Sequence, residues 1–421
     1  MKVFKFGGAS VKDAEGVKNV VNILERYPNE KLIVVVSAMG KTTNALEKVV
    51  RATTSEEAEK LIKEIEAYHY QVAEGCIRTS LTKQNITYTL NKTFALLRKV
   101  VAEYPKEPFD ERYDQVVSFG EHISVLIVCA CLSDKQIPNM WMRAQNIIHT
   151  DSNYREGKVD FEKTLASYKK FMPEAFELVD ILVMEGFVGS TATGKTTTLG
   201  REGSDYTAAI MAYCANAESV TIWKDVPGVL NADPKWFDNT IKIDHLSYQD
   251  AIELAYYGAT VIHPKTIKPL QNKNIPLFVR SFLQPDAPGT RIDNDTSQLP
   301  VPCFIFKVQQ VLISLSPKDF SFIVEENLSR IFDILAQYKV KTNVMQNSAI
   351  NFSLCLDFDP DKVPALIEAL RSDFRVLYNK DLELVTIRYY DQPTIDRVSI
   401  EKRVLLEHKS RYTVQIVMQN K

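Results

Sequence analysis

The first residues that could do chemistry lie between a short strand and a helix. Val3–Phe6 has the apolar character of a strand, and apolar residues of 17–24 recur at helical spacing. Between them, Gly7 and Gly8 let the backbone turn its N–H groups toward a ligand, and the helix adds its positive end. Lys5 supplies a point charge. Together these groups suit a phosphate; the alternative is a plain glycine turn beside a surface lysine.

A second glycine-bearing turn, Gly200–Tyr206, leads into the apolar stretch Thr207–Cys214. Arg201 offers the forked guanidinium that pairs well with a carboxylate. Ser204 or Asp205 is expected to cap the helix that follows, and capping alone would explain the aspartate. The turn is therefore a candidate site for an acidic group.

A third candidate is the carboxylate of Glu121. The preceding segment Gln115–Gly120 is expected to form a strand and a turn, which would present this side chain at the end of the strand. The alternative is that Glu121 lies in the first turn of a helix, where its charge complements the helix dipole.

Residues Gly189–Thr196 match the phosphate-loop pattern GxxxxGK[ST] and follow a strand-like run. That pattern requires a helix to begin at its Lys-Thr pair. Here Thr196–Leu199 is β-branched and Gly200 ends it, which favours a strand or hairpin. We therefore predict that Lys195 lies in a hairpin, mostly solvated, near the turn at Gly200.

The elements that must position these groups alternate between strand-like and helix-like patterns, as in an α/β sheet. A long polar stretch, 45–103, is rich in helical patterns. Strands are expected at Val3–Phe6, Leu32–Val36, Ile181–Val188, Ser219–Lys224 and Pro276–Val279. The continuous β-branched run in the second of these indicates a strand covered on both faces.

The pattern changes after a stretch rich in Pro, Asp and Asn, 286–302, which indicates a domain boundary. Strand and helix patterns over 309–380 then follow the order βαββαβ, the ferredoxin-like order. A second, shorter copy would combine 302–308 with 381–421, and it has no closing helix after Met418. We expect a catalytic domain over 1–292 and two small domains behind it.

Composition excludes several classes of protein. The 421 residues suit two to four domains at ~100–200 residues each. With 53 acidic and 51 basic residues, no basic excess points to nucleic acid or to an anionic membrane. The longest apolar run, Ile123–Leu132, is about half the ~20 residues that a bilayer requires. Met1–Phe4 enters a strand pattern without an apolar leader.

The six cysteines include no CxxC pair, and the six histidines show no HxxxH or HxH spacing. Neither a disulfide scaffold nor a dedicated metal site is expected. Buried, reduced thiols in a cytoplasmic protein are the expectation.

Five motifs, in order along nearly the whole chain, resemble those of the aspartate kinases of the amino-acid kinase family. KFGGASV at 5–11 resembles KFGG[TS]SV, and SFGE at 118–121 resembles SxGE. GREGSDYTA at 200–208 resembles GRGGSDYTA, with Glu202 in place of a glycine. Residues 223–235 and 247–266 resemble WTDVxGxYxADPR and SYxEAxELAYFGAKVxHPRT. The carboxy-terminal βαββαβ units look like the paired ACT domains of the family.

The resemblance implies a fold and a set of residue roles. The fold is an amino-acid-kinase-like, mostly parallel sheet flanked by helices, followed by ferredoxin-like ACT units. Lys5 would contact the transferring phosphoryl group, and Asp205 would orient the cationic groups. Glu121 would hold the ammonium of aspartate and Arg201 its α-carboxylate, beside Thr43 and Ser204. The nucleotide would contact Lys5, Gly7, Gly8, Ser10, Lys224, Asp225, Leu230, Lys235, Thr260 and Val261.

Departures from the family pattern fall mostly in the nucleotide half. Lys224 stands where a threonine is usual, Leu230 replaces a tyrosine, and Lys235 replaces an arginine. Thr260 replaces the lysine of the GAK motif, which removes one positive charge near ATP. Lys224 and Lys265 are the candidates to supply it.

The implied reaction needs little from the protein besides alignment and charge. The β-carboxylate of aspartate is already ionised at neutral pH, because its pKa lies near ~4, so no general base is required. In-line phosphoryl transfer depends on positioning and charge neutralisation. Mg²⁺ carried by ATP uses few protein ligands, so the absence of a metal motif is no objection.

We therefore predict a cytoplasmic aspartate kinase that makes 4-phospho-L-aspartate at the start of lysine, threonine and methionine synthesis. Its partners would be ATP, L-aspartate and a second copy of the chain bound through the ACT region. A lysine or threonine effector would bind near Ser316–Phe322 and Met345–Ile350; the alternative is that the shortened unit serves only dimerisation. The rival functions are a relative acting on another acid or nucleotide, and an amino-acid sensor with an inactive kinase half.

Overall fold

The computed structural model describes residues 1–103, 107–259, 262–296, 301–319 and 321–421. The chain divides into two compact units. The first holds the described residues of 1–229, 244–252 and 261–297, and the second those of 230–243, 253–260 and 298–421.

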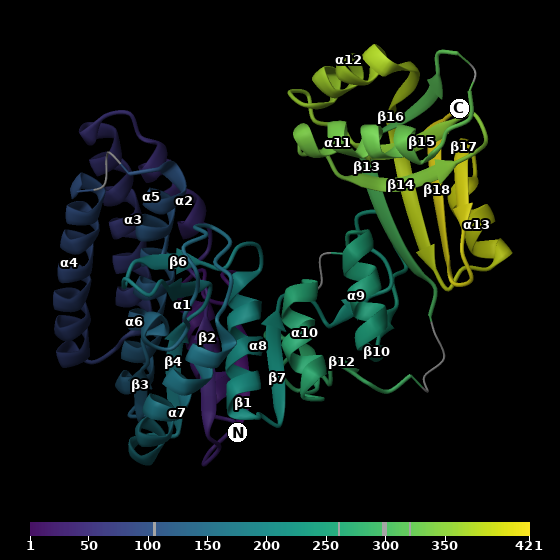
Figure 1. Cartoon of the computed structure of the whole chain (residues 1–421). Helices are drawn as coiled ribbons and strands as arrows, with labels where there is room; N and C mark the ends of the chain where they lie inside the picture. Colours follow the sequence, from purple (N-terminus) through teal and green to yellow (C-terminus); the bar gives the residue numbers. More distant parts are fainter. Residues whose placement is uncertain (104–106, 260–261, 297–300, 320) are drawn as a thin grey trace. The chain divides into compact units, whose positions relative to one another are not determined.

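An eight-stranded sheet forms the centre of the first unit, in the order β10-β12-β11-β7-β1-β2-β4-β3 (Figure 1). Every neighbouring pair is parallel except β11 and β12. The strands are β1 (Lys2–Phe6), β2 (Leu32–Val36), β3 (Asn139–Trp141), β4 (Ile181–Glu185), β7 (Ser219–Lys224), β10 (His245–Ser247), β11 (Leu277–Ser281) and β12 (Thr290–Asp293). The expected α/β class with a mostly parallel sheet is confirmed.

Helices cover the sheet because its strands are apolar on both faces. Phe4 and Phe6 belong to the largest hydrophobic cluster among the described residues, called the large core, together with residues of the helices Ala14–Leu24 and Phe119–Asp134. The side chains at the alternating positions of β1 face the helix Gly203–Ala215. The helices are α1 (Ala14–Leu24), α2 (Thr42–Arg51), α3 (Ser55–Cys76), α4 (Ser80–Glu103), α5 (Phe109–Val117), α6 (Phe119–Asp134), α7 (Phe161–Leu178), α8 (Gly203–Ala215), α9 (Tyr248–Tyr257) and α10 (Pro264–Asn272), with a 3₁₀ turn at Ala144–Asn146.

The predicted strand at Gln115–Gly120 is wrong, because these residues lie in α5 and at the start of α6. Tyr113, Val116 and Val117 are buried on one face, at the i, i+3, i+4 spacing of a helix, and they join the large core. Packing of that face outweighs the β propensity of two adjacent valines. The predicted strand Ile181–Val188 is divided, since the chain turns at Gly186 and Phe187 between β4 and β5 (Val188–Ser190).

In the described residues, one helical stretch, Phe109–Asp134, is long and apolar enough to cross a membrane by length and composition. About three quarters of its most apolar window, 72%, is buried inside the protein. Side chains from both of its helices belong to the large core, which accounts for their apolar character.

The second unit contains a six-stranded antiparallel sheet in the order β14-β15-β13-β16-β18-β17 (Figure 1). Its strands are β13 (Cys303–Pro317), β14 (Thr342–Asn347), β15 (Phe352–Asp357), β16 (Phe374–Arg388), β17 (Lys402–Lys409) and β18 (Thr413–Asn420). Its helices are α11 (Glu325–Gln337), α12 (Val363–Asp373) and α13 (Gln392–Ser399). Two further strands are β8 (Val229–Leu230) and β9 (Lys242–Ile243).

Two ferredoxin-like strand orders share this sheet, because β13 and β16 are long enough to serve both. The first order is β14-β15-β13-β16 and the second is β13-β16-β18-β17. Where they meet, the pairing of β13 with β16 shifts register between Lys307 and Leu312, and Gln309 and Asp381 both have positive φ. The segment 302–308, which the sequence assigned to the second copy, therefore supplies the first half of β13 from Cys303 on.

Candidate active site

A cavity of about 770 Å³ lies in the first unit, beyond the carboxyl ends of β1 and β7. Clefts at that edge of a parallel sheet are the usual ligand sites of open α/β folds. Of the residues that the sequence singled out, the cavity brings together Lys5, Gly8, Thr43, Glu121, Arg201, Ser204, Asp205 and Lys224. Segments more than 200 residues apart in the chain thus meet at one site.

The other predicted residues lie elsewhere. Gly7, Ser10 and Asp225 belong to the first unit but do not line the cavity. Leu230 and Lys235 belong to the second unit. Thr260 and Val261 lie outside the described residues.

Two lysines share one buried carboxylate at the strand ends. Lys5 on β1 is level with Ile222 on β7, so Lys224 lies two residues further on the same face of the sheet. Asp205, in the first turn of α8, is 2.6 Å from Lys5 Nζ through Oδ1 and 3.9 Å from Lys224 Nζ through Oδ2. Two ammonium groups around one carboxylate leave a net positive charge, which suits phosphate oxygens.

The glycine turn after β1 is fixed by close backbone contact. A Cβ on Gly8 would lie 2.7 Å from the carbonyl oxygen of Ala38, so a side chain cannot be accommodated there. Gly40 N–H donates to Gly8 O, which joins the loops after β1 and β2. The helix α1 begins only at Ala14, and Asp13 caps it by accepting from Gly16 N. The positive end of this helix is therefore capped by an aspartate rather than presented at Gly7 and Gly8.

The predicted helix cap in the second turn is wrong. Glu202 is the N-cap residue of α8, in the left-handed region at φ 54°, and Ser204 and Asp205 lie inside the first turn. Asp205 pairs with the two lysines rather than with backbone N–H groups. The start of α8 packs tightly against the residue after β4, since a Cβ on Gly186 would lie 2.4 Å from Ser204 Cβ, and this packing positions Asp205. Arg201 is exposed to the cavity.

Glu121 lies in the first turn of α6 and is buried. Ala38 N–H donates to its Oε1 at 3.4 Å, while Oε2 has no hydrogen-bond partner among the described residues. The pKa of Glu121 is raised to about 8, chiefly by burial and also by the nearby Glu185, against the opposing effects of backbone N–H groups and Lys5. A carboxyl group that lines a cavity and has one oxygen without a partner suits a cationic group of a ligand.

Glu185, at the end of β4, is the buried neighbour that stabilises this wall of the site. It accepts from Trp141 Nε1 and from Ala144 N, both at 2.9 Å, and lies 3.2 Å from His122 Nδ1. Its hydrogen-bonding capacity is thus used within the protein.

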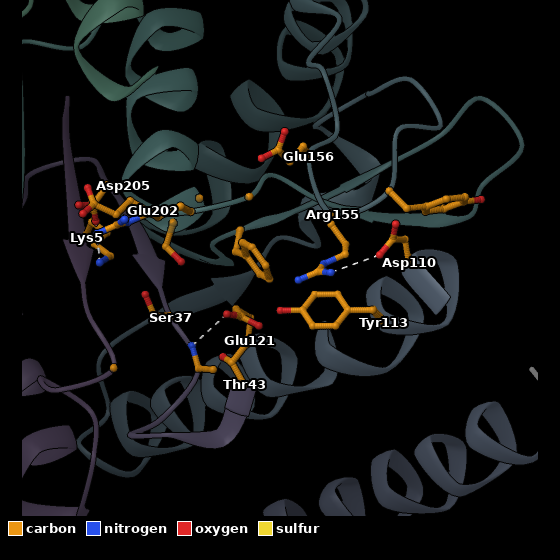
Figure 2. Close-up of a pocket in the computed structure, with 18 of the residues that line it drawn as sticks. Lys5, Ser37, Thr43, Asp110, Tyr113, Glu121, Arg155, Glu156, Glu202 and Asp205 are labelled. Atoms are coloured by element: carbon orange, nitrogen blue, oxygen red, sulfur yellow. Dashed lines mark hydrogen bonds and ion pairs between the residues drawn. The ribbon is translucent and has the colours of Figure 1, made fainter. Parts of the chain in front are cut away.

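Sequence reasoning missed the wall of the cavity opposite Lys5. Asp110 and Tyr113 come from α5, and Arg155 and Glu156 come from the loop before α7 (Figure 2). Nothing in the local sequence marks these residues, because only the packing of the loop against α5 brings them to the cavity.

The phosphate-loop match is a hairpin, as predicted. β5 (Val188–Ser190) pairs antiparallel with β6 (Thr196–Thr198), and no helix begins at the Lys-Thr pair. Lys195 is half-buried rather than mostly solvated, because its Nζ forms an ion pair with the buried Glu111, and neither residue lines the cavity.

Lys195→Ala is therefore expected to retain at least about half of the wild-type activity. The lysine reaches a carboxylate of α5 and no phosphate, and an ion pair with a partly exposed lysine contributes little. Initial rates at saturating substrates check this. Loss of activity as severe as that of a Lys5 variant would show that the hairpin binds phosphate after all.

The described residues contain no cluster of three or more His, Cys, Asp or Glu side chains able to hold a metal ion. The six cysteines are free, and five of them are buried.

Comparisons with known proteins agree with this geometry. The family model described as "Amino acid kinase family" matches residues 1–281. The chain is 30% identical to lysine-sensitive aspartokinase 3 of Escherichia coli over 84% of its length and 78% of that protein. It is also 30% identical to a chloroplastic bifunctional aspartokinase/homoserine dehydrogenase of Arabidopsis thaliana, but it spans only 42% of that longer protein.

Solved structures of aspartokinases are similar to this chain over nearly its whole length. The structure of E. coli aspartokinase III in complex with lysine and aspartate has a TM-score of 0.83 at 25% identity, covering 99% of this chain and 95% of that one. The same enzyme in complex with aspartate and ADP also has a TM-score of 0.83. An aspartate kinase from Clostridium acetobutylicum, at 23% identity and a TM-score of 0.80, shares the fold.

Proposed function

We infer, since the chain belongs to the amino acid kinase family and within it to the aspartokinases, that it transfers the γ-phosphoryl group of ATP to the β-carboxylate of L-aspartate. The products are 4-phospho-L-aspartate and ADP. One observation carries this proposal: the same cavity joins the Lys5–Asp205–Lys224 cluster to the buried carboxyl group of Glu121, whose Oε2 has no hydrogen-bond partner among the described residues, and to Arg201.

The residue roles proposed here are those that the family resemblance implies, and the cavity supports the roles of the residues that line it. Lys5 contacts the transferring phosphoryl group, and Asp205 holds the ammonium groups in place. Glu121 binds the substrate ammonium and Arg201 its α-carboxylate, with Thr43 and Ser204 beside them. The family motifs alone suggest the nucleotide-binding positions Gly7, Gly8, Ser10, Lys224, Asp225, Leu230, Lys235, Thr260 and Val261, of which Gly8 and Lys224 line the cavity.

Catalysis in this site requires alignment rather than proton transfer. The attacking β-carboxylate is already ionised, so the protein has to place it in line with the phosphoryl group and neutralise charge. Lys5 and Lys224 supply positive charge where the phosphoryl oxygens become more negative. Mg²⁺ would arrive with ATP, because that ion often keeps its waters and needs few protein ligands. Asp205, which pairs with both lysines and lines the cavity, is a carboxylate that would lie beside that ion.

Two rival functions remain, and one assay separates them. A relative acting on another acid would release ADP with that acid, and a sensor with an inactive kinase half would release none. The substitutions at Lys224, Leu230 and Thr260 are what favour the sensor. We expect ADP release that depends on aspartate, with little from glutamate or without an acceptor. Release with glutamate alone, or none with aspartate, would reject the proposal.

The carboxy-terminal third is proposed to regulate the enzyme. The catalytic domain is 1–292, the first ACT domain is 309–380, and the second combines 302–308 with 381–421. One relative is named for lysine sensitivity and its structure holds lysine, which supports a lysine effector over threonine. We place that site near Ser316–Phe322 and Met345–Ile350, of which Phe320 lies outside the described residues. The enzyme would act in the cytoplasm, in the synthesis of lysine, threonine and methionine.

A homodimer through the second unit is the further part of this proposal. Several large apolar side chains of the first ferredoxin-like half are exposed: Phe322, Phe332, Met345, Ile350 and Leu377. A closed two-fold contact is the commonest way to cover such a surface.

Leu377→Lys is expected to shift the protein from dimer to monomer, because it puts a charge on an exposed apolar position of β16. Light scattering across a tenfold range of concentration measures the change. Leu81→Lys is the matched control, since Leu81 is equally exposed on α4 of the catalytic unit. A wild-type chain that is monomeric throughout would remove the basis of this proposal.

A further inference from the structure

Arg155 lies in the wall of the cavity that sequence reasoning missed, and neither the family motifs nor the comparisons assign it a role. It belongs to the loop 151–157, which closes on itself through Asp151: Asn153 N–H and Lys158 N–H both donate to Asp151 Oδ1. Glu156 N–H also donates to Asn153 O, and the Asn153 side-chain amide donates to Glu156 O. The loop therefore holds a defined shape.

The backbone of Arg155 has a conformation that favours glycine. Its φ is 67°, in the left-handed region, which L side chains adopt rarely. Arg155 N–H donates to Asp114 Oδ2 at 2.9 Å, and the fully buried Asp114 also accepts from Thr198 N and Thr198 Oγ1. A large cationic side chain is thus held at a backbone conformation that glycine would adopt with less strain. Residues with such strained backbones cluster at functional sites.

The guanidinium group is positioned inside the cavity. Its Cζ lies 4.6 Å from the ring centroid of Tyr113 and 5.8 Å from that of Phe109, so aromatic faces hold its plane. Nη1 lies 3.3 Å from Asp110 Oδ1, in a pair whose side chains are both more than 40% exposed. A guanidinium has five N–H donors, so this arrangement leaves capacity for a ligand.

Figure 2 shows the order of the charged groups along the cavity. Lys5 and Asp205 lie at one end, Glu121 lies near the middle beside Thr43, and Arg155 lies on the other side with Tyr113. An aspartate whose β-carboxylate meets Lys5 and whose ammonium meets Glu121 directs its α-carboxylate away from Lys5. A carboxylate has about four acceptor positions, enough for two guanidinium groups.

We propose that Arg155 is a second carboxylate-binding residue, which contacts the α-carboxylate of L-aspartate together with Arg201. This rests on the proposed function. Asp110 pairs with the guanidinium and would compete with the substrate for it. Bidentate guanidinium–carboxylate pairing adds geometric selection, so Arg155 favours an acceptor that carries an α-carboxylate over one that lacks it.

The competing explanation is that Arg155 only fastens the loop to α5 through Asp110. The two explanations predict opposite results in two variants. Arg155→Gly removes the side chain and relieves the left-handed backbone, so it should not lower the melting temperature. It should nevertheless raise KM for aspartate about 10- to 150-fold, the range for a lost hydrogen bond to a charged group. Asp110→Asn should lower KM by about 1.4- to 5-fold, because it removes a weak competitor.

The experiment measures KM for aspartate at saturating ATP, ATP affinity without aspartate, and thermal unfolding, for the wild type and four variants. Arg155→Lys should be intermediate, since it keeps the charge and loses the fork. Lys195→Ala is the matched control: it breaks another ion pair between α5 and a neighbouring segment, outside the cavity, and should leave KM within about twofold.

L-Aspartate α-amide, which lacks the α-carboxylate charge, identifies the group that Arg155 contacts. The preference of the wild type for aspartate over this amide should fall in Arg155→Gly. An unchanged preference, a KM within twofold of the wild type, or equal increases of KM in Arg155→Gly and Asp110→Asn would each overturn the proposal. If the wild type itself releases no ADP with aspartate, the proposed function fails instead.

Discussion

Lys5→Met is expected to lower kcat about 10²- to 10³-fold, with a much smaller change in KM for ATP. The ammonium group lies at the strand end, 2.6 Å from Asp205, where the phosphoryl oxygens carry most negative charge in the transition state. Methionine keeps the length and apolar stem of the side chain and removes the charge. Initial-rate kinetics with varied ATP measure both parameters.

Lys12→Met is the matched control for this variant. It makes the same exchange at an exposed lysine of the loop after β1, outside the cavity, and should retain nearly full activity. Circular dichroism should show that both variants are folded, because Lys5→Met leaves Asp205 with Lys224, 3.9 Å away. A Lys5→Met protein that keeps more than about a third of kcat would exclude the assigned role.

Glu121→Ala and Arg201→Ala are expected to raise KM for aspartate about 10- to 150-fold each, since each removes a charge-assisted contact to a group that does not react. Because positioning also contributes to the rate, kcat is expected to fall as well. ATP affinity measured without aspartate should change little. A large loss of ATP affinity in either variant would place that residue in the nucleotide site instead.

The raised pKa of Glu121 adds a pH dependence to this prediction. With a pKa of about 8, the carboxyl group is protonated at pH 7 and must lose its proton to pair with an ammonium. Aspartate affinity should therefore rise between about pH 6 and pH 8, with a proton released on binding. Calorimetry in buffers of different ionisation enthalpy detects that proton, and Glu121→Gln should abolish both effects.

Glu121 also makes the stability of the folded protein depend on pH. The pKa in the folded protein is raised from the ordinary value of 4.5, so the folded state binds the proton more tightly than the unfolded state does. The contribution of Glu121 is most favourable below about pH 4.5 and is lost as the pH rises toward 8. Glu121→Gln should remove this part of the pH dependence of the melting temperature.

Local patterns determined much of the architecture. The β-branched runs at 32–36 and 219–224 became β2 and β7 with the expected bounds, because such residues are stable where both faces of a strand are covered. The hairpin at 188–198 also followed from local chemistry, since three threonines and a glycine cannot begin a phosphate-loop helix. Lys5, Gly8, Glu121, Arg201 and Asp205 were found because each belongs to a contiguous motif.

Only the tertiary structure decided what depends on packing between distant segments. Val116 and Val117 formed a helix because that helix buries one face in the core, which no local propensity reports. Asp205 left its expected cap position because β1 and β7 place two ammonium groups within its reach. Arg155 reached the cavity because Asp114, on a different element, holds its loop. Sequence patterns record which groups are available, whereas distances between groups far apart in the chain arise only when the whole core packs.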